Sequence, residues 1–239
     1  MRRRNTEQGA TNGAEVRLTL NCQLFTNVHQ HVSTDQYILE HSQPEDELLA
    51  RLERDANVHL LHPRMVSGHI QGRLLSSLSW MIRPRRVLEI GTYVGYSAMC
   101  LAEGLAEDGK VITLDIDDEI EDMARRYIAK SRYASKIDFI VGDAVKLIPD
   151  MDEVFDLVFI DGNKRDYIEY FETVLPKVRQ NGFILADNTL WAGKVLEKPA
   201  SNDYQTKGLQ AFNDYIAKCD AVDKFILPLR DGLTIMRVK

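Results

Sequence analysis

The stretch Glu89-Ile90-Gly91-Thr92-Tyr93-Val94-Gly95-Tyr96-Ser97 determines how the rest of this sequence is interpreted. It starts at the end of a short apolar run, residues 87–90, which predicts a buried strand, and its two glycines lead into a helical pattern. In doubly wound α/β sheets, ligands bind at turns of this kind, outside the carboxyl ends of the strands. The third glycine of the G-x-G-x-x-G pattern, which binds a dinucleotide pyrophosphate, is missing. The stretch therefore favours a ligand without a pyrophosphate, and a tight turn that binds nothing is the alternative.

Further apolar runs follow this strand and alternate with helical patterns. They predict strands over residues 111–114, 137–141, 155–160 and 182–186 in a parallel sheet covered on both faces. Two last strands, residues 224–228 and 233–238, are joined by Arg230-Asp231-Gly232, and an Asp-Gly pair between apolar runs predicts a hairpin. We expect an α/β fold with a doubly wound, mostly parallel seven-stranded sheet whose last strand runs antiparallel.

The residues before this sheet have a different character. Residues 1–33 are expected to form an N-terminal tail or extension, because their polar beginning shows no usable period. Residues 34–84 are expected to be helical, and a helix over residues 68–81 ends before Pro84. We therefore predict a single domain over residues 34–239, with a helical lid or dimer region over 34–84 and a Rossmann-like core over 85–239.

The composition of the 239 residues excludes several classes of protein. No apolar run approaches the roughly 20 residues of a membrane-spanning helix, so no membrane partner is expected. The three cysteines are widely spaced and odd in number, which argues against a disulfide framework and favours a cytoplasmic location. The formal net charge of −6 gives no overall attraction to nucleic acid. However, the acids are concentrated between Glu103 and Asp166, so the weakly basic remainder leaves an RNA substrate open.

Two further strand ends suit an adenosyl ligand. Asp115 closes the second strand, where an acid can accept both hydroxyls of a ribose, although a solvated acid is the alternative. Gly142-Asp143-Ala144 follows the third strand and is expected to border an adenine.

Polar side chains also follow the fourth and fifth strands. Asp161 and Lys164 come after the fourth strand, and Asp187 and Asn188 come after the fifth. Neighbouring parallel strands bring these oxygens together, where they suit a hard divalent cation, Mg²⁺ first and Mn²⁺ or Ca²⁺ as alternatives. Helix capping is the alternative for each aspartate alone. The histidines lie elsewhere, and a zinc site at His59-x-x-His62 is the weaker metal hypothesis.

Four motifs, in this order, resemble the S-adenosylmethionine-dependent, cation-dependent O-methyltransferases of the caffeoyl-CoA and catechol type. They are the stretch of residues 89–97, Asp161-Gly162-Asn163-Lys164, Asp187-Asn188-Thr189-Leu190-Trp191-Ala192-Gly193 and Leu227-Pro228-Leu229-Arg230-Asp231-Gly232-Leu233-Thr234. The resemblance runs from about Met65 to Lys239. It departs from the family at Gly162-Asn163, and the first 60 residues match no family pattern.

The resemblance implies a role for each matching residue. The cofactor-binding set would be Ser67, Glu89, Gly91, Thr92, Tyr93, Ser97, Asp115, Ala144 and Asp161, and the metal ligands would be Asp161, Asp187 and Asn188. Lys164 and Asp161 would be catalytic, with Lys164 as the general base for in-line methyl transfer to a hydroxyl. Trp191 is expected to form an aromatic wall, with core packing as the alternative.

The resemblance also implies the partners and leaves some alternatives open. The acceptor would be a catechol-like or phenolic small molecule, and the enzyme would be a homodimer. Some bacterial relatives methylate 5-hydroxyuridine in tRNA, which is the first alternative. A dehydrogenase that uses NAD and a non-catalytic adenosyl-binding module are the alternatives from other classes.

Overall fold

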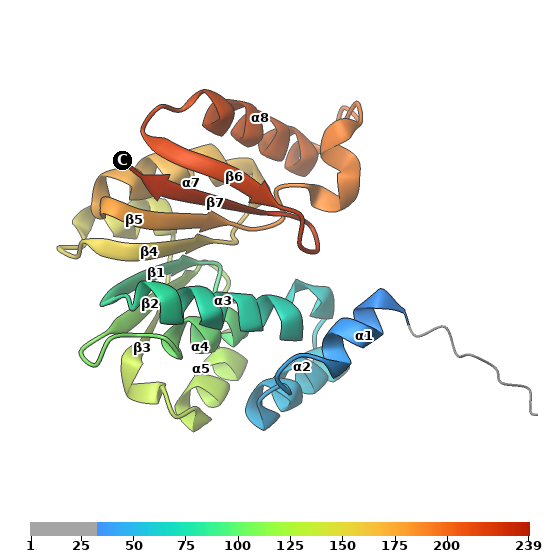
Figure 1. Cartoon of the computed structure of the whole chain (residues 1–239), viewed down its shortest axis with the longest axis vertical. Coiled ribbons are helices and arrows are strands. Elements are labelled where there is room, and N and C mark those ends of the chain that lie inside the picture. The colour runs from blue at the N-terminus through green and yellow to red at the C-terminus, as the bar shows by residue number, and fades with distance from the viewer. Residues whose placement is uncertain (1–32) are drawn as a thin grey trace, which may run out of the picture.

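A computed structural model describes residues 33–239 of the chain (Figure 1). The expected tail therefore lies outside the described residues, apart from Ser33. The described chain forms a sheet of seven strands in the order β3-β2-β1-β4-β5-β7-β6. Their bounds are β1 (Arg86–Ile90), β2 (Lys110–Asp115), β3 (Ile137–Val141), β4 (Phe155–Ile160), β5 (Val178–Ala186), β6 (Val222–Leu227) and β7 (Leu233–Val238).

The direction of the strands confirms the expected topology. Strands β1 to β5 pair in parallel, and β7 pairs antiparallel with both β5 and β6. The chain leaves β1 toward β2 on one side and later returns to β4 on the other side. The carboxyl ends of β1 and β4 therefore flank the point where the strand order reverses, which is where doubly wound sheets bind ligands.

Helices cover both faces of this sheet (Figure 1). Before the sheet come α1 (Thr34–Glu40), α2 (Glu47–His59), η1 (Pro63–Met65) and α3 (His69–Ile82), and between the strands come α4 (Tyr96–Ala102), α5 (Glu121–Lys130), α6 (Ala144–Leu147), α7 (Tyr167–Val174) and α8 (Tyr204–Lys218). Alternate residues of β4 show the two layers. Phe159 packs with α2 to α5, whereas Val158 packs with α7 and α8.

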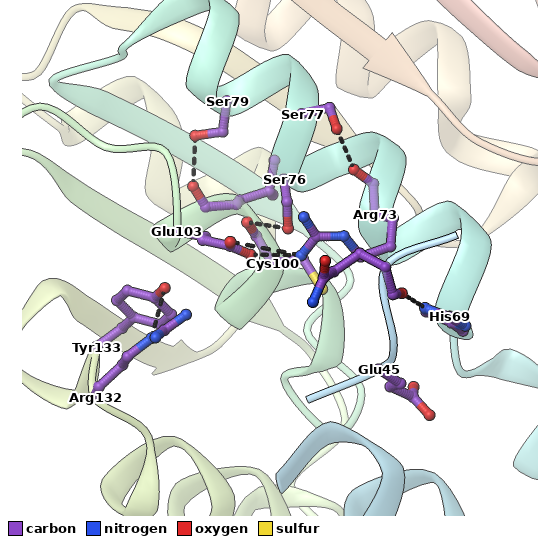
Figure 2. A network of polar contacts seen from close by, with 12 residues as sticks. Glu45, His69, Arg73, Ser76, Ser77, Ser79, Cys100, Glu103, Arg132 and Tyr133 are labelled. Carbon is purple, nitrogen blue, oxygen red and sulfur yellow. Dashed lines mark hydrogen bonds and ion pairs between the residues drawn. The ribbon is translucent and has the colours of Figure 1, made fainter. Parts of the chain in front are cut away.

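Polar contacts fasten α3 to α4 (Figure 2). The hydroxyls of Ser76 and Ser79 donate hydrogen bonds to the backbone oxygens of Cys100 and Leu101, at 3.1 Å and 2.6 Å. One turn earlier on α3, Arg73 pairs with Glu103 at 3.1 Å. The serines are buried, so their hydroxyls stabilise the packing by satisfying backbone groups at the end of α4. The helix α3 is thus fixed on the core of the molecule.

The structure differs from the expected bounds at β5 and α4, and β6 begins two residues earlier than expected, at Val222. Strand β5 begins at Val178 instead of residue 182. It continues through an irregularity at Asn181, which adopts a left-handed conformation (φ 59°), and its pairing with β4 shifts register between Phe155 and Leu157. Helix α4 ends at Ala102, whereas the sequence pattern predicts a helix through about Ala106. Within residues 33–239, no helix combines the length and the apolar character that crossing a bilayer requires.

Candidate active site

A cavity of about 600 Å³ lies at the carboxyl ends of the parallel strands. Its wall includes most of the site residues expected from the sequence, namely Ser67, Gly91, Tyr93, Asp115, Ala144, Asp161, Lys164, Asp187, Asn188 and Trp191. Glu89, Thr92 and Ser97 do not line the cavity and are buried beside it. The topology therefore brings residues from five strand ends around one space.

The turn after β1 is shaped by the neighbouring strand β4. Gly91 has a φ of 101°, and a Cβ atom at this position would collide with the backbone carbonyl of Asp161. Only glycine fits both the left-handed conformation and this close approach. Gly91 is therefore required for the packing of β1 against β4, in addition to its place in the cavity wall.

Asp115 is held at the end of β2 by two backbone groups. One carboxylate oxygen accepts a hydrogen bond from the backbone N–H of Tyr93 at 2.7 Å, and the other accepts one from Asp117 at 3.0 Å. Burial raises the pKa of Asp115 above its ordinary value. At the end of the neighbouring strand β3, Ala144 begins α6, whose first turn is capped by Asp143. The carboxylate and the helix start border the same part of the cavity.

Glu89 is a completely buried acid on β1. One of its carboxyl oxygens accepts a hydrogen bond from the hydroxyl of Thr113, which also bonds to Thr92. The other oxygen, Oε1, has no partner among the described residues 33–239. Burial raises the pKa of Glu89 to about 8, because the charged form is poorly solvated there. A cationic partner for Oε1 would remove this penalty.

The other half of the cavity gathers two carboxylates, an amide and an ammonium group. Lys164 Nζ lies 2.7 Å from Asp161 Oδ1, and only 10% of the lysine side chain is exposed. Asp187 is buried, and its pKa is raised by burial and by the nearby charge of Asp161. Asn188 follows in a left-handed conformation and lines the same cavity as both aspartates. Two carboxylates this close to one another in a partly buried site are stabilised by a positive charge between them.

The departure at Gly162-Asn163 has a local explanation. A Cβ atom at Gly162 would lie 2.9 Å from the ring of Tyr170, which lines the cavity. Asn163 accepts a hydrogen bond from Gln205 at 3.0 Å, and the side-chain oxygen of Gln205 accepts one from the backbone of Lys164 at 3.0 Å. The small residue thus makes room for an aromatic ring, and the asparagine connects the lysine turn to α8.

Two cavity contacts were not expected from the sequence. Gln71 on α3 donates a hydrogen bond to Asp187, and Arg230, in the β6–β7 loop, donates one to Gln71. Arg230 belongs to the fourth family motif, but no local signal marks Gln71 or either contact, since the partners lie 116 and 159 residues apart in the chain.

Among the described residues, the structure shows no cluster of zinc ligands around His59 and His62. His59 contacts the backbone oxygen of Asp55 through Nδ1. In the part of the chain that the structure describes, no three histidine, cysteine, aspartate or glutamate side chains surround a common point. The set around Asp161 has two carboxylates and an amide, so oxygen ligands dominate it.

Comparison with known proteins assigns the chain to a family. Residues 39–239 match the O-methyltransferase family. This chain is an O-methyltransferase. It is 31% identical to a caffeoyl-CoA O-methyltransferase of Stellaria longipes, over 89% of this chain and 92% of the relative. It is also 31% identical to a catechol O-methyltransferase of Niastella koreensis, over 92% of this chain and all of the relative (100%).

Solved structures of O-methyltransferases have the same fold. TomG from Streptomyces achromogenes, in complex with S-adenosylmethionine, superposes with a TM-score of 0.80 at 30% identity and covers 88% of this chain and 98% of its own. An O-methyltransferase from Bacillus cereus, in complex with S-adenosylhomocysteine, gives 0.79 at 29% identity, with 88% and 99% covered. The expected Rossmann-like methyltransferase fold is confirmed, and the enzyme uses S-adenosylmethionine. The dehydrogenase and the non-catalytic module are therefore set aside.

Proposed function

We propose that this O-methyltransferase transfers the methyl group of S-adenosylmethionine to a hydroxyl of a catechol-like or phenolic small molecule, with the help of a divalent cation. The observation that carries the proposal is the cluster of Asp161, Lys164, Asp187 and Asn188 in the same cavity as the Asp115 end of β2. Two relatives are named after caffeoyl-CoA and catechol, which supports an aromatic hydroxyl acceptor.

The cavity fits the methyl donor. Asp115 suits the ribose hydroxyls, and the start of α6 at Ala144 suits the adenine. The unpartnered oxygen of Glu89 suits the ammonium group of the methionine part, because a buried acceptor with a raised pKa is stabilised by a cation. Ser67, Gly91, Tyr93 and Asp161 complete the proposed donor site at the cavity wall, and Thr92 and Ser97 support it from beneath.

The other half of the cavity fits a hard cation. Asp161, Asp187 and Asn188 would supply three oxygen ligands, which suit Mg²⁺, or Mn²⁺ or Ca²⁺, and leave positions for the acceptor. The two carboxylates repel one another, and Lys164 is the cation that contacts Asp161 in this structure. A bound divalent cation would balance the charge of both aspartates.

The residues of the chain would divide the reaction between them. When bound, the donor supplies an electrophilic methyl group and the cation supplies positive charge that favours ionisation of a chelated hydroxyl. To act as the base, Lys164 would first release its own ammonium proton to solvent when the divalent cation binds. The neutral amine Nζ, which Asp161 fixes at the cavity wall, would then take the hydroxyl proton. Trp191 and Tyr170 line the cavity and would hold a flat ring in place. Orientation of the acceptor oxygen toward the methyl group supplies several kcal/mol.

A methyl-transfer assay with labelled S-adenosylmethionine tests the proposal. The acceptors are catechol, a caffeoyl thioester, and tRNA with and without 5-hydroxyuridine, each with Mg²⁺ or with excess EDTA. Transfer to the small phenols that EDTA abolishes is the expected result. Transfer to tRNA alone would show that the acceptor is tRNA and not a small phenol. Full activity in EDTA would exclude a role of the divalent cation in the reaction. The homodimer is a separate prediction, and light scattering tests it by measuring the molar mass of the protein in solution.

Variants assign the roles within the cluster. Asp187→Ala should abolish cation-dependent transfer while S-adenosylhomocysteine still binds, because Asp187 lies on the cation side of the cavity. Asp161→Ala should lose transfer and weaken donor binding as well. Lys164→Met should lower kcat by about 10²–10⁴, the usual contribution of a general base, with little change in donor affinity. An unchanged kcat in Lys164→Met would exclude the base role.

A further inference from the structure

The carboxylate of Asp187 is held from outside its own strand end. Gln71, on α3, donates its amide N–H to Asp187 Oδ2 at 2.6 Å, and the backbone N–H of Asn188 binds Oδ1 at 2.8 Å. Gln71 is 2% exposed, so water does not compete for this bond. Both carboxylate oxygens are therefore fixed in direction, and each keeps a lone pair for another partner.

Arg230 and Asp187 select the same orientation of the Gln71 amide from its two ends. Its guanidinium donates to Gln71 Oε1 at 3.2 Å and to the backbone oxygen of Val66 at 3.4 Å. A guanidinium group has donors only, so the oxygen of the amide must face Arg230 and the N–H group must face Asp187. Without Arg230, Gln71 Oε1 loses the donor that holds this end of the amide in place.

Both ends of this connection are anchored. Helix α3 is fastened to α4 by the buried serine hydroxyls and by the Arg73–Glu103 pair, which hold the backbone of Gln71 in place (Figure 2). Arg230 adopts a left-handed conformation (φ 50°), which is unfavourable for a residue with a Cβ atom. This conformation belongs to the turn between β6 and β7, where the backbone N–H of Gly232 binds the backbone oxygen of Leu229 at 2.9 Å, and the turn fixes the backbone from which the guanidinium reaches Gln71.

We infer that Gln71 and Arg230 are positioning residues for Asp187, and that Arg230 acts through Gln71. The inference rests on the proposed cation site. A carboxylate that is free to rotate binds a cation more weakly than one held by a hydrogen-bonded partner, and loss of such a partner typically lowers metal affinity 10–100-fold. The helical region before the sheet thus takes part in cation binding, although it supplies no proposed ligand.

Mn²⁺ binding tests the inference without any turnover. Free Mn²⁺ is measured by electron paramagnetic resonance in the presence of saturating S-adenosylhomocysteine, for the parent, Gln71→Met, Arg230→Gly and the double variant. Methionine keeps the length of the side chain and removes the amide, and glycine suits the left-handed conformation at position 230. We expect Gln71→Met to bind Mn²⁺ about 10–100-fold more weakly, and Arg230→Gly to be weakened to a smaller extent.

Gln210→Met is the matched control. Gln210 also uses its amide to hold a loop, donating to the backbone oxygens of Val195 and Glu197 at 2.9 Å, and it does not line the cavity. Mn²⁺ affinity should be unchanged in this variant, and the affinity for S-adenosylhomocysteine should be unchanged in all of them. Far-ultraviolet circular dichroism shows that each variant is folded, and Arg230→Gly tests the inference even if Gln71→Met does not fold.

The Mn²⁺ affinity of the double variant shows whether Arg230 acts through Gln71 or independently of it. If Arg230 acts through Gln71, then Arg230→Gly causes no further loss in the Gln71→Met background. Losses that multiply in full would show that Arg230 acts on the site by its own charge and would overturn the inference. Parent-like Mn²⁺ affinity in both single variants would also overturn it. A parent that binds no Mn²⁺ would overturn the proposed cation site as well, so the two failures are distinguishable.

Discussion

At the scale of single residues, Glu89 stands out because it is buried with one carboxyl oxygen unpartnered among residues 33–239. Such a group is usually excluded from a core, since burial of an unpaired charge is strongly unfavourable. It persists here beneath a cavity that suits a cationic ligand group. We regard its raised pKa as a property of the enzyme before the donor binds.

The raised pKa of Glu89 makes a prediction about stability. The folded state holds the proton up to a pKa of about 8, whereas an exposed glutamate releases it near 4.5, so the folded state binds more protons between these values. The free energy of unfolding should therefore fall as the pH rises through this window, by at most about 1.4 kcal/mol per pH unit. Glutamine does not titrate, so the Glu89→Gln variant should lack this pH-dependent part of the free energy of unfolding.

Urea unfolding without the donor measures the difference between parent and Glu89→Gln at the two ends of that window. Other titrating groups are common to both proteins and cancel in the difference. The variant should gain stability relative to the parent at the alkaline end. A difference that stays constant across the window would mean that Glu89 is ionised throughout.

At the scale of elements, the close approach of β1 and β4 decides the geometry of the cavity floor. Gly91→Ala should be destabilising for two reasons, the left-handed conformation and the collision with the backbone of Asp161. Gly193→Ala is the matched control, since Gly193 also has a positive φ (82°) but no atom within 4 Å of an added Cβ. The control should lose about 1–2 kcal/mol, and Gly91→Ala should lose about 1–3 kcal/mol more.

Chemical denaturation gives both values, and titration with S-adenosylhomocysteine shows whether the cavity is disturbed. Only Gly91→Ala should bind the ligand more weakly, because only its Cβ displaces a residue of the cavity wall. Equal losses of stability in the two variants would show that β1 and β4 can move apart without strain.

The positions of the strands and helices explain which site residues could be predicted from the sequence and which could not. Asp115, Asp161 and Asp187 could be placed together because each follows a strand, and the topology of a doubly wound sheet brings strand ends to one edge. Gln71 could not, because its partner lies 116 residues away and its position on a helix gives no hint of a buried polar contact. The start of β5 was missed because Asn181 interrupts the strand pattern with a left-handed residue.

At the scale of the whole molecule, both apolar layers share one sheet. Leu52 and Leu75 of the helical region pack in the same cluster as Phe159 of the sheet, so residues 34–84 have no core of their own within the described chain. The single domain over residues 34–239 stays a prediction, and its consequence is one cooperative unfolding transition.

The fluorescence of the two tryptophans of the chain tests this prediction, because they lie on opposite faces of the sheet. Trp80 lies on α3, and Trp191 packs against the cluster on the other face of the sheet. The variants Trp80→Phe and Trp191→Phe each leave one fluorescent reporter. In each variant the fluorescence midpoint in urea should coincide with that from circular dichroism. Separated midpoints would show that the helical region unfolds independently.

The position of β7 has a consequence for synthesis on the ribosome. It is the last of the seven strands in the chain, yet it lies between β5 and β6, and its Thr234 pairs with Ala186, the residue before Asp187. While the polypeptide is being translated, β5 and β6 leave the exit tunnel before the strand that separates them. Strand β6 pairs with β7 alone among the described strands, so β6 joins the sheet only together with β7, and the edge beside Asp187 is completed only after residues 233–238 have been made.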